Sequence, residues 1–197
     1  MAVRRELRDL PGRLKPHVGP RPNAGGLAIY GAVVCSLAAT VLAFPHLRTP
    51  SLTTLLPGIF LSGGLVVVLG LIDDLQGSLP AKKLTTQGLA VLVLALHAQA
   101  AGSGPALTGL AQVGAGLLLL VWMVGLTNAM NLIDGVDGLA AGVAAIMGLG
   151  LAALALSLGR SEMALVAATV AGACLAFLRS NAYPARIFMG DTGSMFL

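Results

Sequence analysis

The sequence predicts an all-α integral membrane protein, a polytopic helical bundle with about six transmembrane helices. Of the 197 residues, 56% are hydrophobic and only 10% are charged, and six apolar stretches are long enough to cross a bilayer. Soluble domains carry about 25% charged residues, and a spanning helix needs about 20 apolar residues. A β-barrel is excluded because the stretches lack the alternating polarity of barrel strands.

Six apolar stretches, free of Asp, Glu, Lys and Arg, follow one another with short connections. In chain order they are Ala24–Phe44, Thr54–Ile72, Leu84–Ala101, Leu107–Thr127, Leu139–Leu158 and Met163–Leu178. Cys35 and Cys174 fall within these stretches, so we expect buried apolar side chains rather than a disulfide or metal ligands. Residues 1–197 are therefore interpreted as a single transmembrane domain.

The basic residues predict how the bundle is oriented. With the N-terminus placed in the cytoplasm, only Arg48 and Arg160 of the 12 Lys and Arg residues fall outside. The others fall inside: Arg4, Arg5, Arg8, Arg13, Lys15, Arg21, Lys82, Lys83, Arg179 and Arg186. This bias follows the positive-inside rule, so the net charge of +4 reports topology and gives no sign of nucleic-acid binding.

Three short acidic stretches hold five of the eight acidic residues: Asp73-Asp74, Asp134 with Asp137, and Asp191. Two predicted spans separate each stretch from the next, so all three should reach the cytoplasmic face. Oxygen ligands without a His or Cys cluster favour Mg²⁺ or Mn²⁺ over zinc. The pattern therefore predicts a metal site for a phosphorylated substrate and phosphoryl transfer dominated by charge stabilisation.

The acidic stretches leave alternatives open. Asp73 and Asp74 follow an apolar run, and adjacent side chains on a helix point about 100° apart. One carboxylate could bind metal while the other orients or deprotonates a substrate, and the sequence leaves open which does which. We expect the segment from Asn128 to Gly138 to form a loop, because Asn, Asp and Gly favour turns and caps. An EF-hand is excluded, because the Glu at its twelfth position is missing.

Four ordered motifs resemble the polyprenyl-phosphate N-acetylhexosamine-1-phosphate transferases, glycosyltransferase family 4. Two of them are Val124–Gly142, with its core Asn-Ala-Met-Asn-Leu-Ile-Asp-Gly-Val-Asp-Gly, and Phe188–Leu197, with Gly-Asp-Thr-Gly-Ser. Asp73-Asp74-Leu75 followed by Lys83, Leu84 and Gln87 is similar to the family's first aspartate motif. The segment Asp9–His17, continuing to Gly26, is similar to its N-terminal cytoplasmic segment.

The resemblance implies an activity and a role for each matching residue. It implies transfer of a sugar 1-phosphate from a UDP-N-acetylhexosamine to undecaprenyl phosphate, with release of UMP, at the cytoplasmic face of a bacterial plasma membrane. This reaction would start a cell-envelope glycan. The resemblance implies Asp73, Asp74 and Asp191 as catalytic residues and Asp191 with Asp74 as ligands of Mg²⁺ or Mn²⁺. Residues implied to bind substrate are Asn128, Asn131, Asp134, Asp137, Lys83 and His17, the last equally well explained as an interfacial residue.

Several alternatives stay open. The continuation Ser194-Met-Phe-Leu197 resembles the GlcNAc-1-phosphate transferases, whereas the phospho-MurNAc-pentapeptide transferases carry a Leu-Ala-Leu type continuation. UDP-GlcNAc is therefore the favoured donor, and other UDP-HexNAc donors remain open. A transporter is disfavoured because its ionisable residues would lie inside the spans. The resemblance also leaves a homodimer open.

The family pattern extends beyond this chain at both ends. The resemblance predicts a further helix before the Asp9 segment, and more helices with a His-rich cytoplasmic loop after Leu197. We therefore expect a catalytic domain that is incomplete at both ends, a fragment. A non-catalytic remnant is the competing interpretation.

Overall fold

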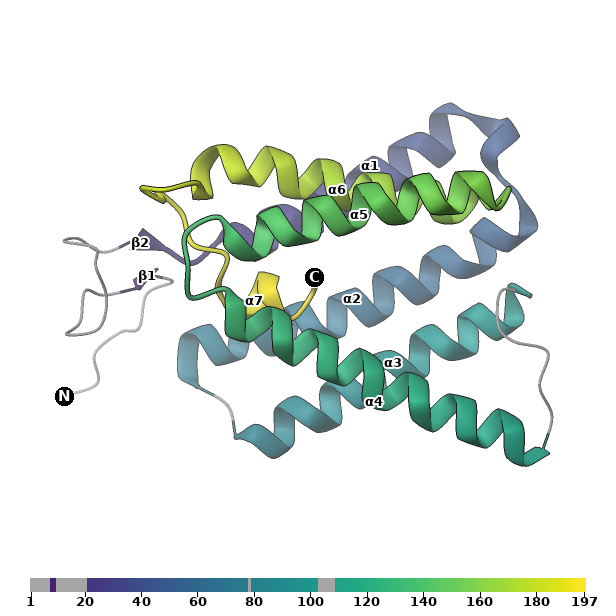
Figure 1. Ribbon diagram of the computed structural model, residues 1–197, viewed down its shortest axis with the longest axis horizontal. Coiled ribbons are helices and arrows are strands. Elements are labelled where there is room, and N and C mark those ends of the chain that lie inside the picture. The colour runs from purple at the N-terminus through teal and green to yellow at the C-terminus, as the bar shows by residue number, and fades with distance from the viewer. Residues whose placement is uncertain (1–7, 10–20, 78, 103–108) are drawn as a thin grey trace.

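The computed structural model describes residues 8–9, 21–77, 79–102 and 109–197 (Figure 1). Six long helices form a bundle, preceded by two short antiparallel strands that the sequence did not lead us to expect. The elements are β1 (Arg8–Asp9), β2 (Arg21–Pro22), α1 (Gly25–Ala43), the 3₁₀ turn η1 (Pro45–Leu47), α2 (Pro50–Gln76), α3 (Pro80–Ala100), α4 (Gly109–Ile133), α5 (Leu139–Ser157), α6 (Ser161–Asn181) and α7 (Gly190–Ser194). The predicted all-α membrane fold class is confirmed.

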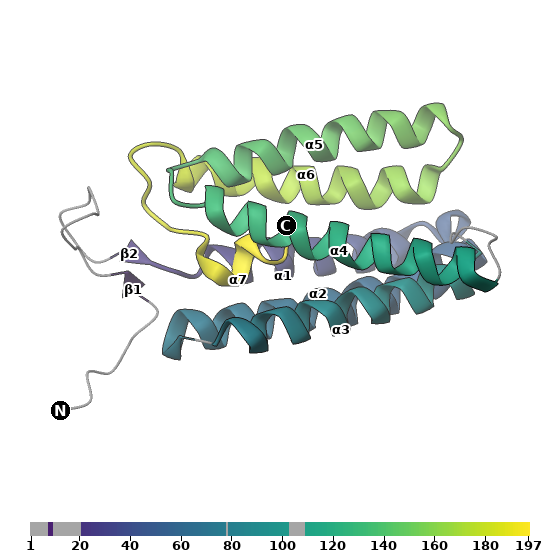
Figure 2. The same cartoon turned by 60° about the horizontal axis from the view of Figure 1, so that its bottom comes forward.

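The helices lie in three tiers (Figure 2). The hairpin of α5 and α6 forms one tier, the hairpin of α2 and α3 forms another, and α1 and α4 lie between them. Short α7 contacts α1, α2 and α4 near one end of the bundle. Because short connections join antiparallel helices, every second connection returns the chain to the same end.

Five helices within the described ranges are long and apolar enough to cross a membrane: α1, α2, α4, α5 and α6. Each corresponds to one of the six predicted spans. The sixth predicted span, Leu84–Ala101, forms most of α3, whose 21 residues are also long enough. However, α3 is more polar than the others, because it includes Lys82, Lys83, Gln87 and His97.

Local sequence signals explain where several helices begin. The Thr49 side chain accepts a hydrogen bond from the Leu52 backbone amide, and Pro50 occupies the first turn of α2. Pro80 occupies the same position in α3. Gly138, with φ of 75°, precedes α5 in the left-handed conformation that glycine adopts without strain. These residues give the hairpins short, defined connections.

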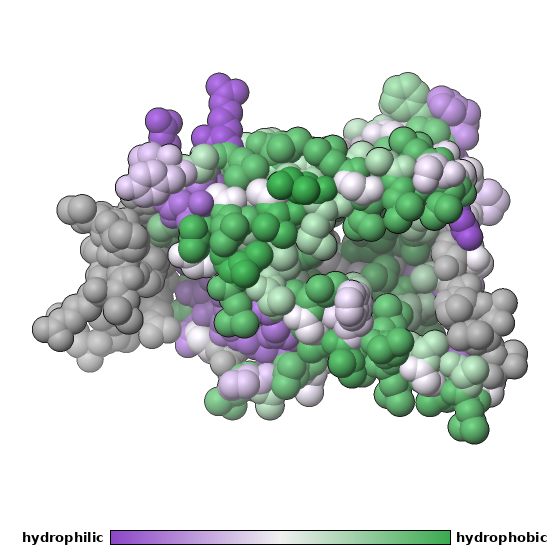
Figure 3. All heavy atoms as spheres, in the orientation of Figure 1, coloured by the Kyte–Doolittle hydropathy of each residue, from purple (hydrophilic) through white to green (hydrophobic). Residues whose placement is uncertain are grey.

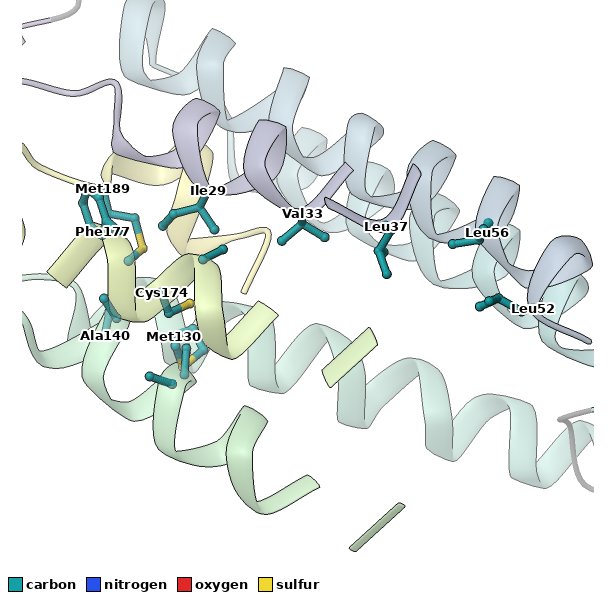
Figure 4. Close-up of a cluster of buried hydrophobic side chains, with 14 residues drawn as sticks. Ile29, Val33, Leu37, Leu52, Leu56, Met130, Ala140, Cys174, Phe177 and Met189 are labelled. Atoms are coloured by element: carbon teal, nitrogen blue, oxygen red, sulfur yellow. The ribbon is translucent and has the colours of Figure 1, made fainter. Parts of the chain in front are cut away.

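The core runs along the bundle axis (Figure 4). Ile29, Val33 and Leu37 of α1 recur every fourth residue and are almost fully buried. Cys174 is buried in the same cluster, as predicted. Cys35 is exposed, so its predicted burial is wrong. It lies two residues from Val33, on the part of α1 that turns away from this buried row.

One end of the bundle is polar. Hydrophobic side chains cover most of the face in Figure 3, and hydrophilic residues gather toward the end that carries the loop between α6 and α7. The end of α2, the start of α3 and the end of α4 meet there, because each donates or accepts a hydrogen bond to α7. The three acidic stretches therefore lie at the same end, as the number of spans predicts.

The predicted loop from Asn128 to Gly138 is mostly wrong, because α4 continues to Ile133. Asn128 and Asn131 therefore belong to the last helical turns, three positions apart on one face. Their side chains bond groups on neighbouring elements, which offsets the competition with the helix backbone that makes Asn a poor helix former. The turn itself is confined to residues 134–138.

Glycines allow α7 to lie directly against two helices. A β-carbon at Gly26 of α1 would lie 2.1 Å from the Gly193 nitrogen, and one at Gly70 of α2 would lie 2.5 Å from the Thr192 α-carbon. Such distances are too short for real β-carbons. A side chain at either position would therefore displace α7.

We expect Gly70→Ala to be about 1–3 kcal/mol less stable than its matched control, the usual cost of overpacking. The control is Gly116→Ala in α4, where an added β-carbon meets nothing within 4 Å. Both changes gain similar helix propensity, about 1 kcal/mol, so their difference reports contact with α7. Thermal unfolding in detergent measures it, and equal melting temperatures for the two variants would contradict this packing.

Candidate active site

Lys83 connects three elements at the polar end. Its ammonium forms salt bridges with Asp73 of α2 and with Asp191 of α7, the latter at 2.8 Å from Nζ to Oδ2. Lys83 lies in the first turn of α3, and Asp73 lies in the last turn of α2. The short connection between these helices therefore brings the two charges together, and α7 closes the cluster.

Asp191 is held on both carboxylate oxygens. Lys83 donates to Oδ2, and the side-chain amide of Asn131 donates to Oδ1 at 2.9 Å. The same amide nitrogen donates to the Ser194 hydroxyl at 2.8 Å, and that hydroxyl donates to the Gly190 carbonyl at 3.1 Å. The Asp191 side chain is 30% exposed, whereas that of Asp73 is 11% exposed. Asp191 is thus fixed in direction and still open to a ligand.

Asp74 points to a different partner from its neighbour Asp73. Its Oδ1 accepts the backbone amide of Asp191 at 2.9 Å, and its Oδ2 accepts the amide and hydroxyl of Thr192 at 3.1 and 2.6 Å. Consecutive positions on a helix diverge by about 100°, as the sequence led us to expect. Asp73 lies against Lys83 of α3 and the Asp191 side chain, and Asp74 lies against the backbone at the start of α7.

A second polar layer lies one helical turn deeper in the bundle. Asn128 donates from Nδ2 to the Gln87 side-chain oxygen at 2.9 Å and to the Val124 carbonyl at 2.8 Å. Gln87 follows Lys83 by four residues, and Asn128 precedes Asn131 by three, so each pair shares a helix face. Gln87 is only 2% exposed. Its helical spacing from Lys83 is the sequence signal that places it beneath the site.

The turn after α4 is fastened to the loop before α7. Asp137 accepts the Ala185 backbone amide at 2.9 Å through Oδ2. The buried Asn181 accepts the Gly138 amide at 3.1 Å and donates to the Ile187 carbonyl at 3.0 Å. Asp137 therefore shapes the rim of the site, and Asn181 is a structural partner that the sequence patterns did not identify.

Asp134 completes an acidic environment. Burial, followed by the negative charges of Asp191 and Asp74, raises the pKa of Asp134 to about 7. Burial is also the main cause that raises the pKa of Asp191, and contact with Asp73 adds to it. Lys83 and Asn131 lower the pKa of Asp191 and so act in the opposite direction. The cluster holds more carboxylates than one ammonium can neutralise, so it favours binding of a further cation.

The residues present fit a hard divalent metal. Among the described residues, no three His, Cys, Asp or Glu side chains converge as a complete ligand set. Mg²⁺ does not require one, because it usually binds through one or two carboxylates together with waters and substrate phosphates. Asp191 is the open carboxylate, and its surroundings supply oxygen donors without sulfur or imidazole, which suits Mg²⁺ or Mn²⁺.

Residues 56–197 match the sequence model of glycosyl transferase family 4. The chain belongs to glycosyltransferase family 4. The matched region begins in α2 and includes all the site residues described above.

Three relatives illustrate the position of the chain within glycosyltransferase family 4. It is 40% identical over 193 residues to a probable undecaprenyl-phosphate N-acetylglucosaminyl 1-phosphate transferase of Bacillus subtilis, covering 96% of this chain and 52% of the relative. It is 36% identical over 221 residues to a decaprenyl-phosphate N-acetylglucosaminephosphotransferase of Mycolicibacterium smegmatis, covering 100% and 52%. It is 38% identical over 191 residues to a phospho-N-acetylmuramoyl-pentapeptide-transferase of a Geobacillus strain, covering 89% and 57%. The chain spans about half the length of these relatives.

The structure brings together most of the side chains expected at the family site. Asp73, Lys83, Asn131 and Asp191 form one bonded cluster, and Asp134 interacts with it electrostatically. The remaining predicted residues surround it: Asp74 bonds α7, Asn128 bonds Gln87, and Asp137 bonds the loop before α7. His17 lies outside the described residues.

The pKa of Asp134 predicts a pH-dependent cost of folding. Because its folded pKa lies above the ordinary value of 3.8, the folded protein holds this proton more tightly than the unfolded chain. The free energy of unfolding should therefore fall as pH rises from about 4 to about 7. Above that range Asp134 is ionised in both states, and the free energy should fall no further on its account.

We expect Asp134→Asn to remove this cost. Measured by thermal unfolding in a metal chelator, the variant should match the parent near pH 4 and exceed it at pH 8, by on the order of a few kcal/mol. A difference in melting temperature that is the same at both pH values would contradict the raised pKa.

Proposed function

We propose that the chain carries the catalytic site of a sugar-1-phosphate transferase that uses a UDP-N-acetylhexosamine, with UDP-GlcNAc favoured, and undecaprenyl phosphate. The observation that carries the proposal is the bonded cluster of Asp73, Lys83, Asn131 and Asp191 at one end of an apolar bundle. Such a site can meet a lipid phosphate at the membrane surface and a soluble nucleotide sugar from water. The names of the relatives from Bacillus and Mycolicibacterium support a polyprenyl phosphate and an N-acetylglucosamine 1-phosphate group as substrates.

In the proposed reaction, an oxygen of undecaprenyl phosphate attacks the phosphorus that carries the sugar. The bond from that phosphorus to the bridging pyrophosphate oxygen breaks, UMP leaves with the bonding electrons, and a sugar diphosphate lipid remains. Negative charge gathers on the transferring and departing oxygens, so positioning and charge stabilisation dominate the catalysis. The lipid product would start a cell-envelope glycan.

We assign the residues of the bonded cluster from their contacts. Asp191, the open carboxylate, would hold the divalent metal, Mg²⁺ or Mn²⁺, and a bound metal would neutralise the phosphate oxygens. Lys83 would donate to a phosphate of either substrate, since its ammonium already lies between two anionic groups. Asp73 would orient the acceptor phosphate or take its proton. Asn131 holds the Asp191 carboxylate in a fixed orientation.

The rim residues have a proposed part in donor binding. Asp134 and Asp137 lie on the turn after α4 at the polar end, where a nucleotide would enter. Asn128 would support the site from beneath through its hydrogen bond to Gln87. Asp74 is proposed to serve the metal site, either as a ligand or through its contacts with the backbone of α7. Substrate binding by His17 and a homodimer remain predictions.

A donor bearing MurNAc-pentapeptide is the second candidate, because the Geobacillus relative is 38% identical over most of this chain. Both donors carry the same UDP group, so the metal and phosphate contacts would not distinguish them. Contacts with the group attached to the sugar would distinguish them, so the rates with the two donors can be compared directly.

The test is UMP release by the purified chain in lipid nanodiscs with undecaprenyl phosphate and Mg²⁺. We expect release from UDP-GlcNAc and little from UDP-MurNAc-pentapeptide. Asp191→Asn should reduce the rate by at least about 100-fold, since it removes the negative charge that holds the metal.

The matched control for Asp191→Asn is Glu162→Gln, which alters a carboxylate bonded to Thr49 at the other end of the bundle. We expect this control to release UMP at the parent rate. Unchanged turnover in Asp191→Asn would refute the metal assignment, and a parent chain without turnover would support the non-catalytic remnant.

We also propose that the site faces the cytoplasm of a bacterial cell. Lys82, Lys83, Arg179 and Arg186 belong to the polar end in the described structure, whereas Arg48 and Arg160 lie at connections of the other end. Positively charged connections tend to stay on the cytoplasmic side.

Cysteine labelling tests this orientation in a Cys35→Ala background, which removes the exposed native thiol. A membrane-impermeant maleimide should label Arg160→Cys in spheroplasts of the expressing cells. It should label Val136→Cys, on the exposed turn after α4, only after the membrane is opened. The opposite pattern would show that the site faces outward.

A further inference from the structure

Helix α7 is too short to determine its own position. It has five residues, and isolated helices shorter than about 12 residues are marginal in water. Its position must therefore come from contacts with other elements. The backbone contacts at Gly26 and Gly70 let α7 approach closely from two sides, but close approach has little directional preference, so hydrogen bonds must fix the orientation of its first turn.

Asp74 supplies those directional bonds. Its carboxylate accepts the backbone amides of Asp191 and Thr192 and the Thr192 hydroxyl, at 2.9, 3.1 and 2.6 Å. The first amides of a helix have no partner within the helix, so a carboxylate there satisfies them. Gly190 has φ of 71°, and a β-carbon on it would lie 2.7 Å from the Asp74 Oδ2. The carboxylate thus lies directly against the backbone that carries Asp191.

Asp74 could serve the metal directly, as a ligand, or indirectly, through Thr192 and the backbone of α7. The Thr192 side chain is completely buried, so it cannot touch a metal ion or a substrate bound at the opening. Its hydroxyl nonetheless makes the shortest of the three bonds to Asp74. If Asp74 is a metal ligand, replacing it should free a coordination position, and the bound metal should gain a water. If Asp74 acts through α7, the number of waters on the metal should stay the same, and the Thr192 hydroxyl is part of the same arrangement.

We infer, building on the proposed metal site at Asp191, that Asp74 is a positioning residue and not a metal ligand. It holds the first turn of α7, together with Thr192, so that the Asp191 carboxylate meets the metal in a fixed direction. The two adjacent aspartates then have different roles: Asp73 faces Lys83 and the substrate side, and Asp74 faces the backbone of α7.

The experiment measures Mn²⁺ binding to the purified, metal-free chain in nanodiscs by electron paramagnetic resonance, without substrates. Pulsed measurements of the same samples in deuterated water count the waters on the bound Mn²⁺. Thr192→Val removes the hydroxyl and preserves the shape, and Thr192→Ser retains the hydroxyl. We expect Thr192→Val to weaken Mn²⁺ binding about 10-fold or more, the usual effect of losing a partner that orients a metal ligand. Thr192→Ser should keep the affinity within about threefold of the parent, because the hydroxyl that bonds Asp74 remains.

Asp74→Asn and the double variant complete the cycle. We expect Asp74→Asn to weaken binding at least as much as Thr192→Val and to leave the number of waters on the bound Mn²⁺ unchanged, because Asp74 does not occupy a coordination position. The double variant should be no weaker than Asp74→Asn alone, because both changes disable the same contact. Thermal unfolding and the number of Mn²⁺ ions bound per chain identify any variant that is not folded. If Asp74→Asn fails that check, Thr192→Val still tests the positioning role, because unchanged Mn²⁺ affinity in that variant would overturn it.

Each other outcome has a definite meaning. If the bound Mn²⁺ gains a water in Asp74→Asn, Asp74 is a ligand and the positioning role is overturned. Unchanged Mn²⁺ affinity in Thr192→Val would also overturn it. Additive losses in the double variant would overturn it as well. If the parent chain binds no Mn²⁺, the proposed metal site fails and the positioning role falls with it. That failure is distinguishable from failure of the positioning role alone, because it is seen in the parent chain and does not depend on any variant.

Discussion

The ammonium of Lys83 is the interaction on which the polar end depends, because it lies between the carboxylates of Asp73 and Asp191. Two unit charges about 4 Å apart interact by about 4 kcal/mol at the effective dielectric constant typical of a protein surface. The repulsion between two such carboxylates is therefore as large as one attraction to an ammonium. A single lysine of α3 offsets this repulsion and joins α2 to α7 through the same two contacts, so charge balance and the assembly of these elements are coupled.

Neutral side chains and backbone amides also stabilise the carboxylates of Asp191 and Asp74. Asn131 donates to Asp191 without adding charge, and Asp74 is satisfied by amides and a hydroxyl of α7 rather than by a cation. Asp134 is half-buried near Asp191 and Asp74, and its raised pKa reflects desolvation first and then these negative charges. The site therefore keeps a negative excess close to its opening. A divalent cation and the phosphates that it binds would relieve this excess together.

The membrane spans could be predicted from the sequence, whereas the helix ends at the site could not. Hydropathy predicts the spans because a 20-residue apolar run has few other stable environments, and the parity of the spans places Asp73, Asp137 and Asp191 at one end. The spans do not predict where a helix stops. Asn131 and its neighbours have turn-forming composition, yet α4 continues through them because their amides find partners on α3 and α7. Tertiary contact overrides local preference there.

The same limit applies to the direction of side chains. The sequence shows that Asp73 and Asp74 are adjacent and diverge on a helix, but the partner of each depends on which elements flank α2. The structure places Lys83 and the Asp191 side chain beside Asp73 and the backbone of α7 beside Asp74, and Gly70, one turn earlier on the same helix, lets α7 come close enough. An adjacent pair of acids is thus suited to a helix end that contacts two neighbours at once. Residues four apart would share one face, whereas the adjacent pair places one carboxylate among the charged side chains of Lys83 and Asp191 and the other against the backbone amides of α7.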